Sequence, residues 1–511
     1  MDFLFPAGGP RGTTVAVTAN GTFGKWPLQA WCDRPGITVA AAEEKGKLSV
    51  AVPADATPGV CWIRLYDPDG ATTLKPFLVG LLPEVIEVEP NDGVAKPQAL
   101  GSPNITVNGR LEKNGDVDCF AVPLKAGQTF VASMEANRTL GSPMDGVLQI
   151  VSPEGFVLEH NDDEHGLDPQ IVFQVPADGT YLVRTMAFPA ETSAAINFAG
   201  APSYVYRLTL TVGGFADHAW PLAVSTSGPA EIQAFGWNIP ESANRLPVAV
   251  PADAASVTLF SPQFANCISV PVESHAVATE TQPAGAREPQ DLQVPVTVSG
   301  RIARQRETDT YRIALKRGDI LHFRVEAHAA GSPLDPVLMI ADSAGKTIQR
   351  VDDTQNSRDP ELNFTAPADG EYLIKIADLN RRGGWRFVYR LTASRPHPDF
   401  KLAVASDSFT LTPGKPLEVP VTIDRTGGFV EEVELTAAEL PAGVTAMPVK
   451  SLPQGDTAKS VKLILTATEG PRSGVLTIRG KSTGSLQLAR QAHAALSGTA
   501  RTANLWLTVV K

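Results

Sequence analysis

GSPMDGVLQI, at residues 141–150, returns as GSPLDPVLMI at residues 331–340, an offset of 190. The match extends in both directions at offsets of 183 to 191, and the change from 190 to 191 marks one inserted residue in a loop. Asp162-Asp163 returns as Asp352-Asp353, Asp168-Pro169 as Asp359-Pro360, Pro176–Tyr181 as Pro367–Tyr372, Asp116–Phe120 as Glu307–Tyr311, and Tyr206–Thr209 as Tyr389–Thr392. A repeat of this length predicts two copies of one domain, each of about 120 residues.

Apolar residues within the first copy follow a period of two. Phe120, Val122 and Leu124 alternate with small or polar residues, as do Tyr181 and Val183. The Pro-Ala-Asp-Gly sequence that precedes the later pair is typical of a turn, because glycine adopts positive φ at no steric cost. A helical repeat would require apolar residues at spacings of three and four, and the sequence of the repeat has no such pattern. Each copy is therefore predicted to be a small antiparallel β-sandwich.

The remaining segments also have the pattern of short strands, and the first and last resemble immunoglobulin-like domains. We predict an all-β protein, a string of β-sandwich modules whose boundaries fall where Pro, charged and polar residues interrupt the strands. The predicted modules are an immunoglobulin-like β-sandwich at 1–83, the first repeat at 84–213, a small β module at 214–275, a linker (276–295) and the second repeat at 276–395, and an immunoglobulin-like β-sandwich at 396–511. The stretch 494–503, rich in Ala, Ser, Thr and Gly, is predicted to be a mobile loop.

Composition excludes several classes of protein. The chain has 511 residues, with 43% hydrophobic and 19% charged residues, which is typical of a folded protein rather than a disordered one. With 44 Lys and Arg against 55 Asp and Glu, the net charge is −11, and this argues against nucleic acid as a partner. No apolar stretch is long enough to span a membrane.

The cysteines and the first residues bear on the compartment. Among the four cysteines, only Cys32 and Cys61 fall in one predicted module, so this pair is the candidate disulfide; the alternative is two small buried apolar side chains. The start of the chain has no basic segment followed by an apolar one. We therefore expect either a cytoplasmic protein or a chain without its leader, and favour the second because the first residues already have the pattern of a strand.

The repeat resembles the bacterial pre-peptidase C-terminal domain. The resemblance rests on a succession of motifs in the first copy, with a good match in the second: Glu87–Asp92, Gly115–Asp118, Gly141–Asp145, Asn161–Asp163 and Pro176–Tyr181. It implies a jelly-roll-like β-sandwich that accompanies the catalytic domains of secreted peptidases, including the collagen-binding domains of clostridial collagenases. It also implies an exported, non-catalytic module. The whole string of modules is similar to large extracytoplasmic proteins of planctomycete-type bacteria.

An acidic cluster is the candidate metal site. Glu87, Glu89 and Asn91 point to one face of an extended segment, and Asp92, Asp116 and Asp118 join them if the fold brings the two segments together. Crowded carboxylates repel one another without a cation, and six flexible oxygen ligands suit Ca²⁺. The matching motif binds calcium in the clostridial family members, so the resemblance implies the same role here. The alternative is a solvated acidic linker.

The second copy has a degraded motif. Glu288, Gln290 and Asp291 match Glu89, Asn91 and Asp92, whereas Ala286 replaces Glu87 and Glu307 replaces Asp116. We therefore expect one better calcium site and one that is poor or absent. The acidic loop Asn161–Asp168 could hold another cation, but Asp and Asn are also common at the ends of hairpins.

No catalytic residue is predicted, because the sequence contains no His-Glu-x-x-His motif and no glycine-rich phosphate loop after a predicted strand. Aromatic side chains could stack on collagen or sugars, although most are expected in the core: Trp26, Trp31, Trp62, Tyr204, Tyr206, Trp220, Trp237, Trp385, Phe387 and Tyr389. The leading hypothesis is a non-catalytic extracytoplasmic protein (secreted, periplasmic or on the cell surface) that binds a protein or polysaccharide of the cell surface or matrix. The alternatives are the accessory C-terminal region of a secreted peptidase and a module that binds or hydrolyses glycosides.

Overall fold

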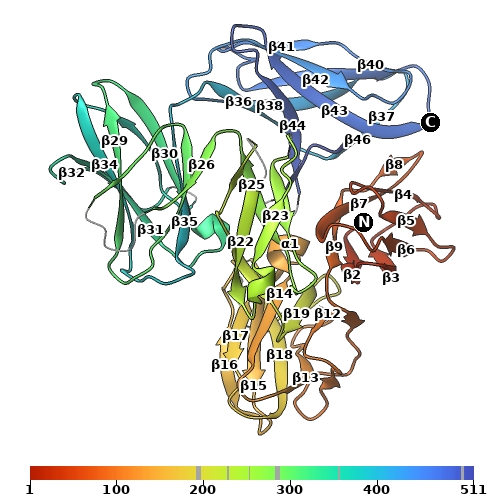
Figure 1. Cartoon of the computed structure of the whole chain (residues 1–511). Helices are drawn as coiled ribbons and strands as arrows, with labels where there is room; N and C mark the ends of the chain where they lie inside the picture. The colour runs from red at the N-terminus through yellow and green to blue at the C-terminus, as the bar shows by residue number, and fades with distance from the viewer. Residues whose placement is uncertain are drawn as a thin grey trace. The chain divides into compact units, whose positions relative to one another are not determined.

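The computed structural model describes residues 1–191, 197–226, 230–252, 254–281, 288–354, 357–496 and 500–510. These residues are nearly all in strands and loops (Figure 1), so the predicted all-β class is confirmed. Contacts divide the chain into two compact units. One contains Met1–Val212 and His397–Lys511, and the other contains Gly213–Pro396.

The first eighty residues form two sheets around a common core. The sheet orders are β1-β3-β6-β5 and β2-β9-β7-β4, with β8 paired to β7. Alternating residues of β6, such as Leu48, Val50 and Val52, are buried, as a period-two strand with one inward face requires. The strands are β1 Phe3–Phe5, β2 Gly8–Pro10, β3 Thr13–Asn20, β4 Gln29–Cys32, β5 Thr38–Ala41, β6 Lys47–Val52, β7 Gly59–Asp67, β8 Gly70–Ala71 and β9 Lys75–Gly80.

The first repeat packs two five-stranded sheets of order β10-β12-β19-β14-β17 and β11-β13-β18-β15-β16. In each sheet one short edge strand pairs in parallel with its neighbour, β10 with β12 and β11 with β13. The elements are β10 Glu84–Ile86, β11 Gln98–Ala99, β12 Ile105–Arg110, β13 Asp118–Leu124, β14 Thr129–Glu135, α1 Asn137–Leu140, β15 Met144–Val151, β16 Val157–Asn161, β17 Gln170–Gln174, β18 Gly179–Pro189 and β19 Val205–Thr211.

The second repeat has the same plan, with sheets β26-β28-β35-β30-β33 and β27-β29-β34-β31-β32. Its edge strands β26 and β27 again pair in parallel, with β28 and β29. The elements are β26 Ala276–Thr279, β27 Gln290–Asp291, β28 Val296–Arg301, β29 Thr308–Leu315, β30 Ile320–Glu326, η2 His328–Ala330, β31 Pro336–Asp342, β32 Thr347–Val351, β33 Glu361–Thr365, β34 Gly370–Asp378 and β35 Val388–Ser394.

A small β module precedes the second repeat. Its sheets have the orders β20-β22-β23 and β21-β25-β24, and they enclose a core around Ile232 and Phe264. The elements are β20 Phe215–Trp220, β21 Val224–Ser225, β22 Ala230–Trp237, η1 Glu241–Ala243, β23 Arg245–Val248, β24 Ser256–Leu259 and β25 Ile268–Glu273.

The C-terminal segment forms a further β module around one core that includes Phe400, Val421 and Leu507. Its longest path of paired strands is β37-β46-β43-β44-β36-β38-β42-β40. The strands are β36 Asp399–Val404, β37 Ser408–Leu411, β38 Leu417–Thr426, β39 Val433–Ala438, β40 Val444–Ala446, β41 Val449–Ser451, β42 Ser460–Ala467, β43 Arg472–Ser482, β44 Ala489–Ala495, β45 Arg501–Thr502 and β46 Leu505–Val509.

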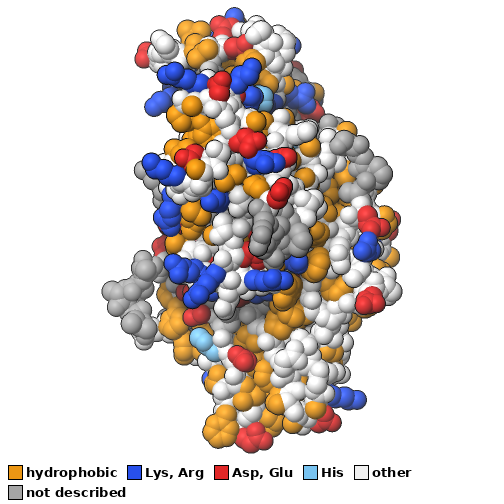
Figure 2. Space-filling view, turned by 60° about the vertical axis from the view of Figure 1, so that its left-hand side comes forward, with side chains coloured by type: hydrophobic (Ala, Val, Ile, Leu, Met, Phe, Trp, Pro, Cys, Tyr) orange, Lys and Arg blue, Asp and Glu red, His pale blue; other side chains and the backbone are white. Residues whose placement is uncertain are grey.

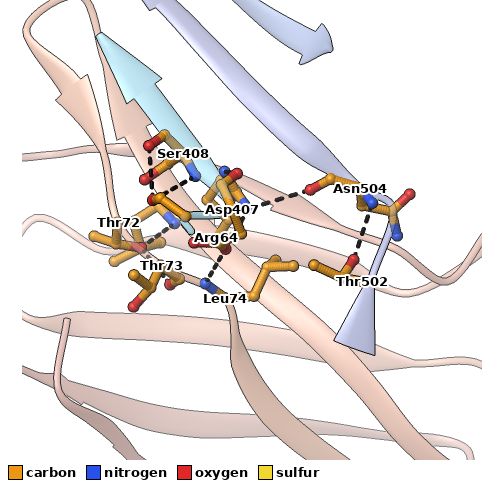
Figure 3. A network of polar contacts seen from close by, with 10 residues as sticks. Arg64, Thr72, Thr73, Leu74, Asp407, Ser408, Thr502 and Asn504 are labelled. Atoms are coloured by element: carbon orange, nitrogen blue, oxygen red, sulfur yellow. Dashed lines mark hydrogen bonds and ion pairs between the residues drawn. The ribbon is translucent and has the colours of Figure 1, made fainter. Parts of the chain in front are cut away.

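A fully buried arginine joins the first and last segments within their unit. The Arg64 guanidinium donates from Nη2 to Asp407 Oδ2 at 2.6 Å and from Nη1 to the Asp407 carbonyl at 2.9 Å (Figure 3). The same carboxylate accepts the backbone N–H of Leu74 at 2.9 Å, and the guanidinium lies over the ring of Trp506. Burial lowers the pKa of Arg64 to about 10. Removing either charged partner would leave a buried charge without compensation.

Two sequence predictions about irregular segments are corrected. Residues 276–295 are not simply a linker, because their ends form β26 and β27; short parallel edge strands depend on backbone hydrogen bonds and show little apolar alternation. The stretch 494–503 contains the end of β44 and all of β45, which pair with each other, while residues 497–499 lie outside the described residues. Within the described residues, no helix has the length and apolar character needed to cross a bilayer.

Candidate cation sites of the two repeats

In the first repeat, the acidic side chains come from the ends of two edge pairings. The backbone N–H of Glu87, just after β10, donates to the carbonyl of Asn108 at 3.0 Å, so the parallel pairing with β12 extends one residue further. The backbone N–H of Cys119 donates to the Asn91 carbonyl at 3.1 Å, which places Asn91 beside the start of β13. These bonds bring the segment 87–92 next to Asp116 and Asp118, which is the contact on which the predicted site depends.

Three of the six predicted ligands form one cluster. One carboxylate oxygen from each of Glu89, Asp92 and Asp116 lies within 4.8 Å of the other two. The Lys113 ammonium is 3.6 Å from both Asp92 and Asp116, and it is mostly exposed. Burial and the nearby Asp92 carboxylate raise the pKa of Asp116. The cluster therefore carries more negative charge than its single lysine balances.

Glu87 and Asp118 meet at a buried tyrosine. The Tyr206 hydroxyl lies 2.5 Å from Asp118 Oδ2 and 3.2 Å from Glu87 Oε2. Burial raises the pKa of Asp118 to about 10, with the Glu87 charge as a further cause, and burial raises the pKa of Glu87 to about 7. The raised pKa values show that burial disfavours the charged form of both carboxyl groups.

Four buried oxygens of this site have no hydrogen-bond partner within the described part of the chain. They come from four of the predicted ligands: Oε1 of Glu89, Oδ1 of Asn91, Oδ1 of Asp116 and Oδ1 of Asp118. Asn91, Asp116 and Asp118 are fully buried, where an unpartnered polar atom is costly. Because carboxylate and amide oxygens are the ligands that Ca²⁺ takes, this donor set fits a calcium ion.

A glycine makes room for the tyrosine. Gly109 stands opposite Tyr206 in the β12–β19 pair, and a Cβ at this position would lie 2.1 Å from the tyrosine ring and 2.6 Å from Glu87 Oε2. In the second repeat Gly300 stands opposite Tyr389, where a Cβ would lie 2.3 Å from the ring. Both repeats therefore need glycine at this position to seat the tyrosine against the acids.

The second repeat builds a related cluster from residues that the sequence analysis missed in part. One carboxylate oxygen from each of Glu280, Glu307 and Asp309 lies within 4.8 Å of the other two. The Tyr389 hydroxyl donates to Asp309 at 2.6 Å and contacts the Tyr311 hydroxyl at 2.8 Å. Burial raises the pKa of Glu280 to about 7 and the pKa of Asp309 to about 8.

The predicted match between the two acidic motifs is wrong. The backbone N–H of Glu280 donates to the Ser299 carbonyl at 2.8 Å, as that of Glu87 does to Asn108, so Glu280 and not Ala286 corresponds to Glu87. Gln290 bonds the backbone around Thr279 as Gln98 bonds that around Ile86, so it does not correspond to Asn91. Ala286 itself lies outside the described residues.

The wrong match arose because Glu288–Asp291 and Glu89–Asp92 have similar local sequences. The signal that could have found Glu280 is its distance from the repeated Gln: eleven residues separate Glu87 from Gln98, and ten separate Glu280 from Gln290. The sequence predicts Tyr206 and Tyr389 either on a possible ligand surface or in the core. They are fully buried and contact the acids, which their shared Tyr-Arg-Leu-Thr sequence could have indicated.

The acidic loop after β16 has a structural role at its end. The Asp168 carboxylate accepts the backbone N–H groups of Asn137 and Arg138 at the start of α1, at 2.7 and 3.1 Å. In the second repeat Asp359 accepts three backbone N–H groups at the start of η2, from residues 327–329. These carboxylates satisfy free helical donors, which accounts for the repeated Asp-Pro pair without a cation.

One sequence motif of nucleophilic enzymes is present at Gly480–Gly484, which has the spacing Gly-x-Ser-x-Gly. Its serine, Ser482, is the last residue of strand β43 and is fully buried. The Ser482 hydroxyl accepts the backbone N–H of Leu488 at 2.8 Å. A nucleophile elbow exposes its serine on a turn between a strand and a helix, and the surroundings of Ser482 do not have this form.

Comparison with known proteins assigns part of the second repeat to a family. Residues 307–378 match the model of the bacterial pre-peptidase C-terminal domain, so the chain contains a domain of the kind that the sequence motifs indicated. The matched stretch runs from Glu307 through Asp378 and includes Asp309. The same identity for the first repeat, and immunoglobulin-like flanking modules, remain predictions.

One curated protein and two solved structures are similar to parts of the chain. A probable subtilase-type serine protease of Deinococcus radiodurans is 35% identical over 96 residues, which are 19% of this chain and 13% of that protein. The pre-peptidase C-terminal domain of a Bacillus anthracis collagenase is 16% identical over 22% of this chain and all of that one, with a TM-score of 0.18. A periplasmic lysozyme inhibitor of Aeromonas hydrophila, PliG, is 16% identical over 23% of this chain and 96% of that one, with a TM-score of 0.17.

Proposed function

We propose that the protein is a non-catalytic extracytoplasmic binding or structural protein whose two repeats are stabilised by calcium. The observation that carries the calcium proposal is a set of four buried oxygens without a hydrogen-bond partner among the described residues, on Glu89, Asn91, Asp116 and Asp118. The Asp116 oxygen has the exposed Lys113 ammonium at 3.6 Å, beyond hydrogen-bond distance. Free oxygens at this depth cost stability unless a cation or water satisfies them. Five carboxylates beside one exposed lysine favour a cation over water.

Bound calcium would hold the edge strand β10 and the segment after it against the rest of the sheet. The segment 87–92 follows β10, which has only three residues and a single strand neighbour, β12. A cation held between this segment and Asp116 would tie the edge to the start of β13. We expect Ca²⁺ rather than Zn²⁺ or Mg²⁺, because all the donors are oxygens from flexible side chains, which suit Ca²⁺, whereas Zn²⁺ favours Cys and His and Mg²⁺ demands a regular octahedron.

Thermal unfolding of the full chain tests this proposal. Millimolar Ca²⁺ is expected to raise the first unfolding transition by about 5 °C or more over the chelated protein, as a ligand at about a hundred times its Kd does. Glu89→Gln should remove most of the shift, whereas Glu43→Gln, an exposed acid of the first module, should leave it intact. An equal calcium shift in all three proteins would contradict the proposal.

The family match supports the non-catalytic and extracytoplasmic parts, because pre-peptidase C-terminal domains accompany secreted peptidases as accessory modules. On the face shown in Figure 2, basic and acidic side chains are interspersed among hydrophobic and uncharged ones. Mixed charge of this kind, with a net charge of −11, suits a protein or polysaccharide of the cell surface or matrix better than nucleic acid.

The second candidate function is an accessory region of a secreted peptidase, and the similarity to a subtilase-type protease favours it. The two candidates separate in a casein-hydrolysis assay. The chain by itself is expected to hydrolyse no casein, and hydrolysis that appears only with a longer natural product would identify the accessory role. Hydrolysis by the purified chain would overturn both.

A further inference from the structure

Two cysteines of the N-terminal module are held beside each other by strands β4 and β7, which are neighbours in Figure 1. Cys32 stands opposite Ile63 in this antiparallel pair. Cys61 precedes Ile63 by two residues on the same strand, so its side chain points to the same face of the sheet. Cys32 and Cys61 are therefore diagonal neighbours on one face, a position from which side chains can touch.

The residues after Cys32 fix this arrangement by three further bonds. The Asp33 backbone N–H donates to the Trp62 carbonyl at 3.1 Å, and the Asp33 carboxylate accepts the Trp62 backbone N–H at 2.7 Å. The Arg34 guanidinium donates to the Val60 carbonyl at 2.5 Å. Residues 33 and 34 are thus bonded to both chain neighbours of Cys61, which leaves the two cysteines little freedom to separate.

The two thiols are neighbours on one sheet face and differ in access to solvent. The interaction between the two thiols lowers the pKa of Cys32 and raises that of Cys61. Cys61 is fully buried, with its Sγ 3.2 Å from the Phe77 carbonyl, whereas Cys32 is partly exposed. The pair therefore combines an accessible thiol that ionises more readily with a buried thiol that stays protonated, the arrangement of an attacking and a resolving cysteine.

We propose that Cys32 and Cys61 are a modification site that closes to a disulfide when the protein meets a small disulfide oxidant such as glutathione disulfide. The Cys32 thiolate attacks one sulfur of the oxidant, forms a mixed disulfide and releases one glutathione thiolate. The Cys61 sulfur then attacks Cys32 Sγ, its proton passes to the second glutathione, and that glutathione leaves. Two protein thiols are oxidised to one disulfide, and one glutathione disulfide is reduced to two thiols.

The inference goes beyond cation binding and does not rest on it. The bridge would link β4 to the middle of β7 and close a loop of 28 residues, which restricts the unfolded chain. It would strengthen the module that contributes Arg64 to the contact with Asp407. Oxidising compartments are those in which such bridges persist, so the site suits an exported protein.

Oxidation of the purified full chain tests the proposal. After incubation with glutathione disulfide, unfolding and alkylation, we expect two of the four cysteines to be protected. Peptide mass mapping without reductant should find residues 32 and 61 in one cross-linked species, lighter by two hydrogens than the separate peptides. The oxidised protein should melt several degrees above the reduced one, and this gain should be absent in Cys32→Ser, which alters the partly exposed partner.

Cys119→Ala is the matched control, because Cys119 lies in the first repeat and should leave the bridge and its thermal gain unchanged. Alkylation of all four cysteines after oxidation would overturn the proposal. So would a glutathione adduct that stays on Cys32, or a bridge that maps to another pair. Calcium titration of the Cys32→Ser protein separates this result from the cation proposal, since the variant keeps every acid of both repeats.

Discussion

The two repeats have the same strand arrangement but different side chains around the buried tyrosine. In both, a glycine of the first long strand makes room for a buried tyrosine whose hydroxyl contacts an aspartate, Asp118 in the first repeat and Asp309 in the second. The first repeat adds Glu89, Asn91 and Asp92 around this centre. The second has the Tyr311 hydroxyl where the first has Phe120, so a tyrosine pair satisfies part of the polar centre. The fold supplies a hydrogen-bonded carboxylate, and the added acids make this centre of the first repeat the stronger candidate for a cation site.

The two repeats also differ in how they pair a buried arginine. Arg207 holds Glu84 through two bonds of 2.7 and 2.8 Å, with side chains only 4% and 5% exposed. The matching Arg390 contacts Glu326 at 3.1 Å, and Glu326 is more exposed and also bonded by Arg324. Asn108 donates to Glu84 and accepts from Arg207, so the edge strand of the first repeat depends on one buried ion pair bridged by an amide. The second repeat instead shares the charge among three charged side chains.

Substitution of these two arginines should have the largest effect on stability. Arg207→Met is expected to cost about 3–5 kcal/mol, because it leaves the buried Glu84 carboxylate without an opposite charge, with only the Asn108 amide still bonded to it. Arg390→Met should cost about 1 kcal/mol, since Glu326 keeps Arg324 and some solvent. Urea unfolding followed by hydrogen exchange of β12 and β28 measures each loss within its own repeat. Equal losses of stability in the two repeats would contradict the expected difference between the two ion pairs.

Changing one acid in each cluster tests whether the sites differ in calcium affinity. Asp116→Asn should weaken the tighter site by about 30- to 100-fold, because one charge less at ligand distance costs about 2–3 kcal/mol. Glu307→Gln should affect only the weaker site. Calorimetric titration of the full chain would show which binding phase moves, and loss of the tight phase in Glu307→Gln would reverse the assignment of the two sites.

The tyrosines should differ in their contribution to stability. Tyr206→Phe removes the donor that serves Asp118 and Glu87 and should destabilise the chelated protein by about 1.5–3 kcal/mol. Tyr311→Phe, which gives the second repeat the ring found in the first, should cost about 1 kcal/mol, since Asp309 keeps Tyr389. Chemical denaturation in chelator measures both. A larger loss for Tyr311→Phe would mean that the tyrosine pair, not the bond to the acid, stabilises this centre.

A smaller effect involves acids away from both clusters. Burial and the neighbouring Asp163 and Asp162 raise the pKa of Asp145 to about 6. Because the folded protein then binds this proton more tightly than the unfolded chain, stability is present below about pH 4 and decreases as the pH rises through 6. Asp145→Asn should remove this dependence, which is worth about 0.5 kcal/mol after solvent screening.

Asp335 is the counterpart of Asp145 in the second repeat. Burial also raises its pKa, but Arg358 and Arg382 oppose the shift. Asp335→Asn should therefore change the pH profile of the melting temperature less than Asp145→Asn does. A profile that responds equally to both substitutions would show that these arginines do not distinguish the two repeats.

The all-β class and the internal repeat could be predicted from the sequence, and so could the grouping of the candidate ligands in the first repeat. Alternation with a period of two encodes a sheet with one buried face, and this pattern is local, so it can be read along the chain. The six predicted ligands Glu87 to Asp118 lie in one region because they occupy two short segments joined by edge pairings that the repeat conserves. Their chemical type, all oxygen donors, was already visible in the residues.

Which residues meet across long sequence separations follows from the packing of the strands and not from any local pattern. Glu280 replaces Glu87 because the hydrogen bonds between β26 and β28 set the register, while the local sequence Glu288–Asp291 imitated the first motif. Arg64 and Asp407 are 343 residues apart, and Cys32 meets Cys61 through a strand pairing. Contacts of this kind arise from how buried faces pack, and no local pattern in a single sequence encodes them.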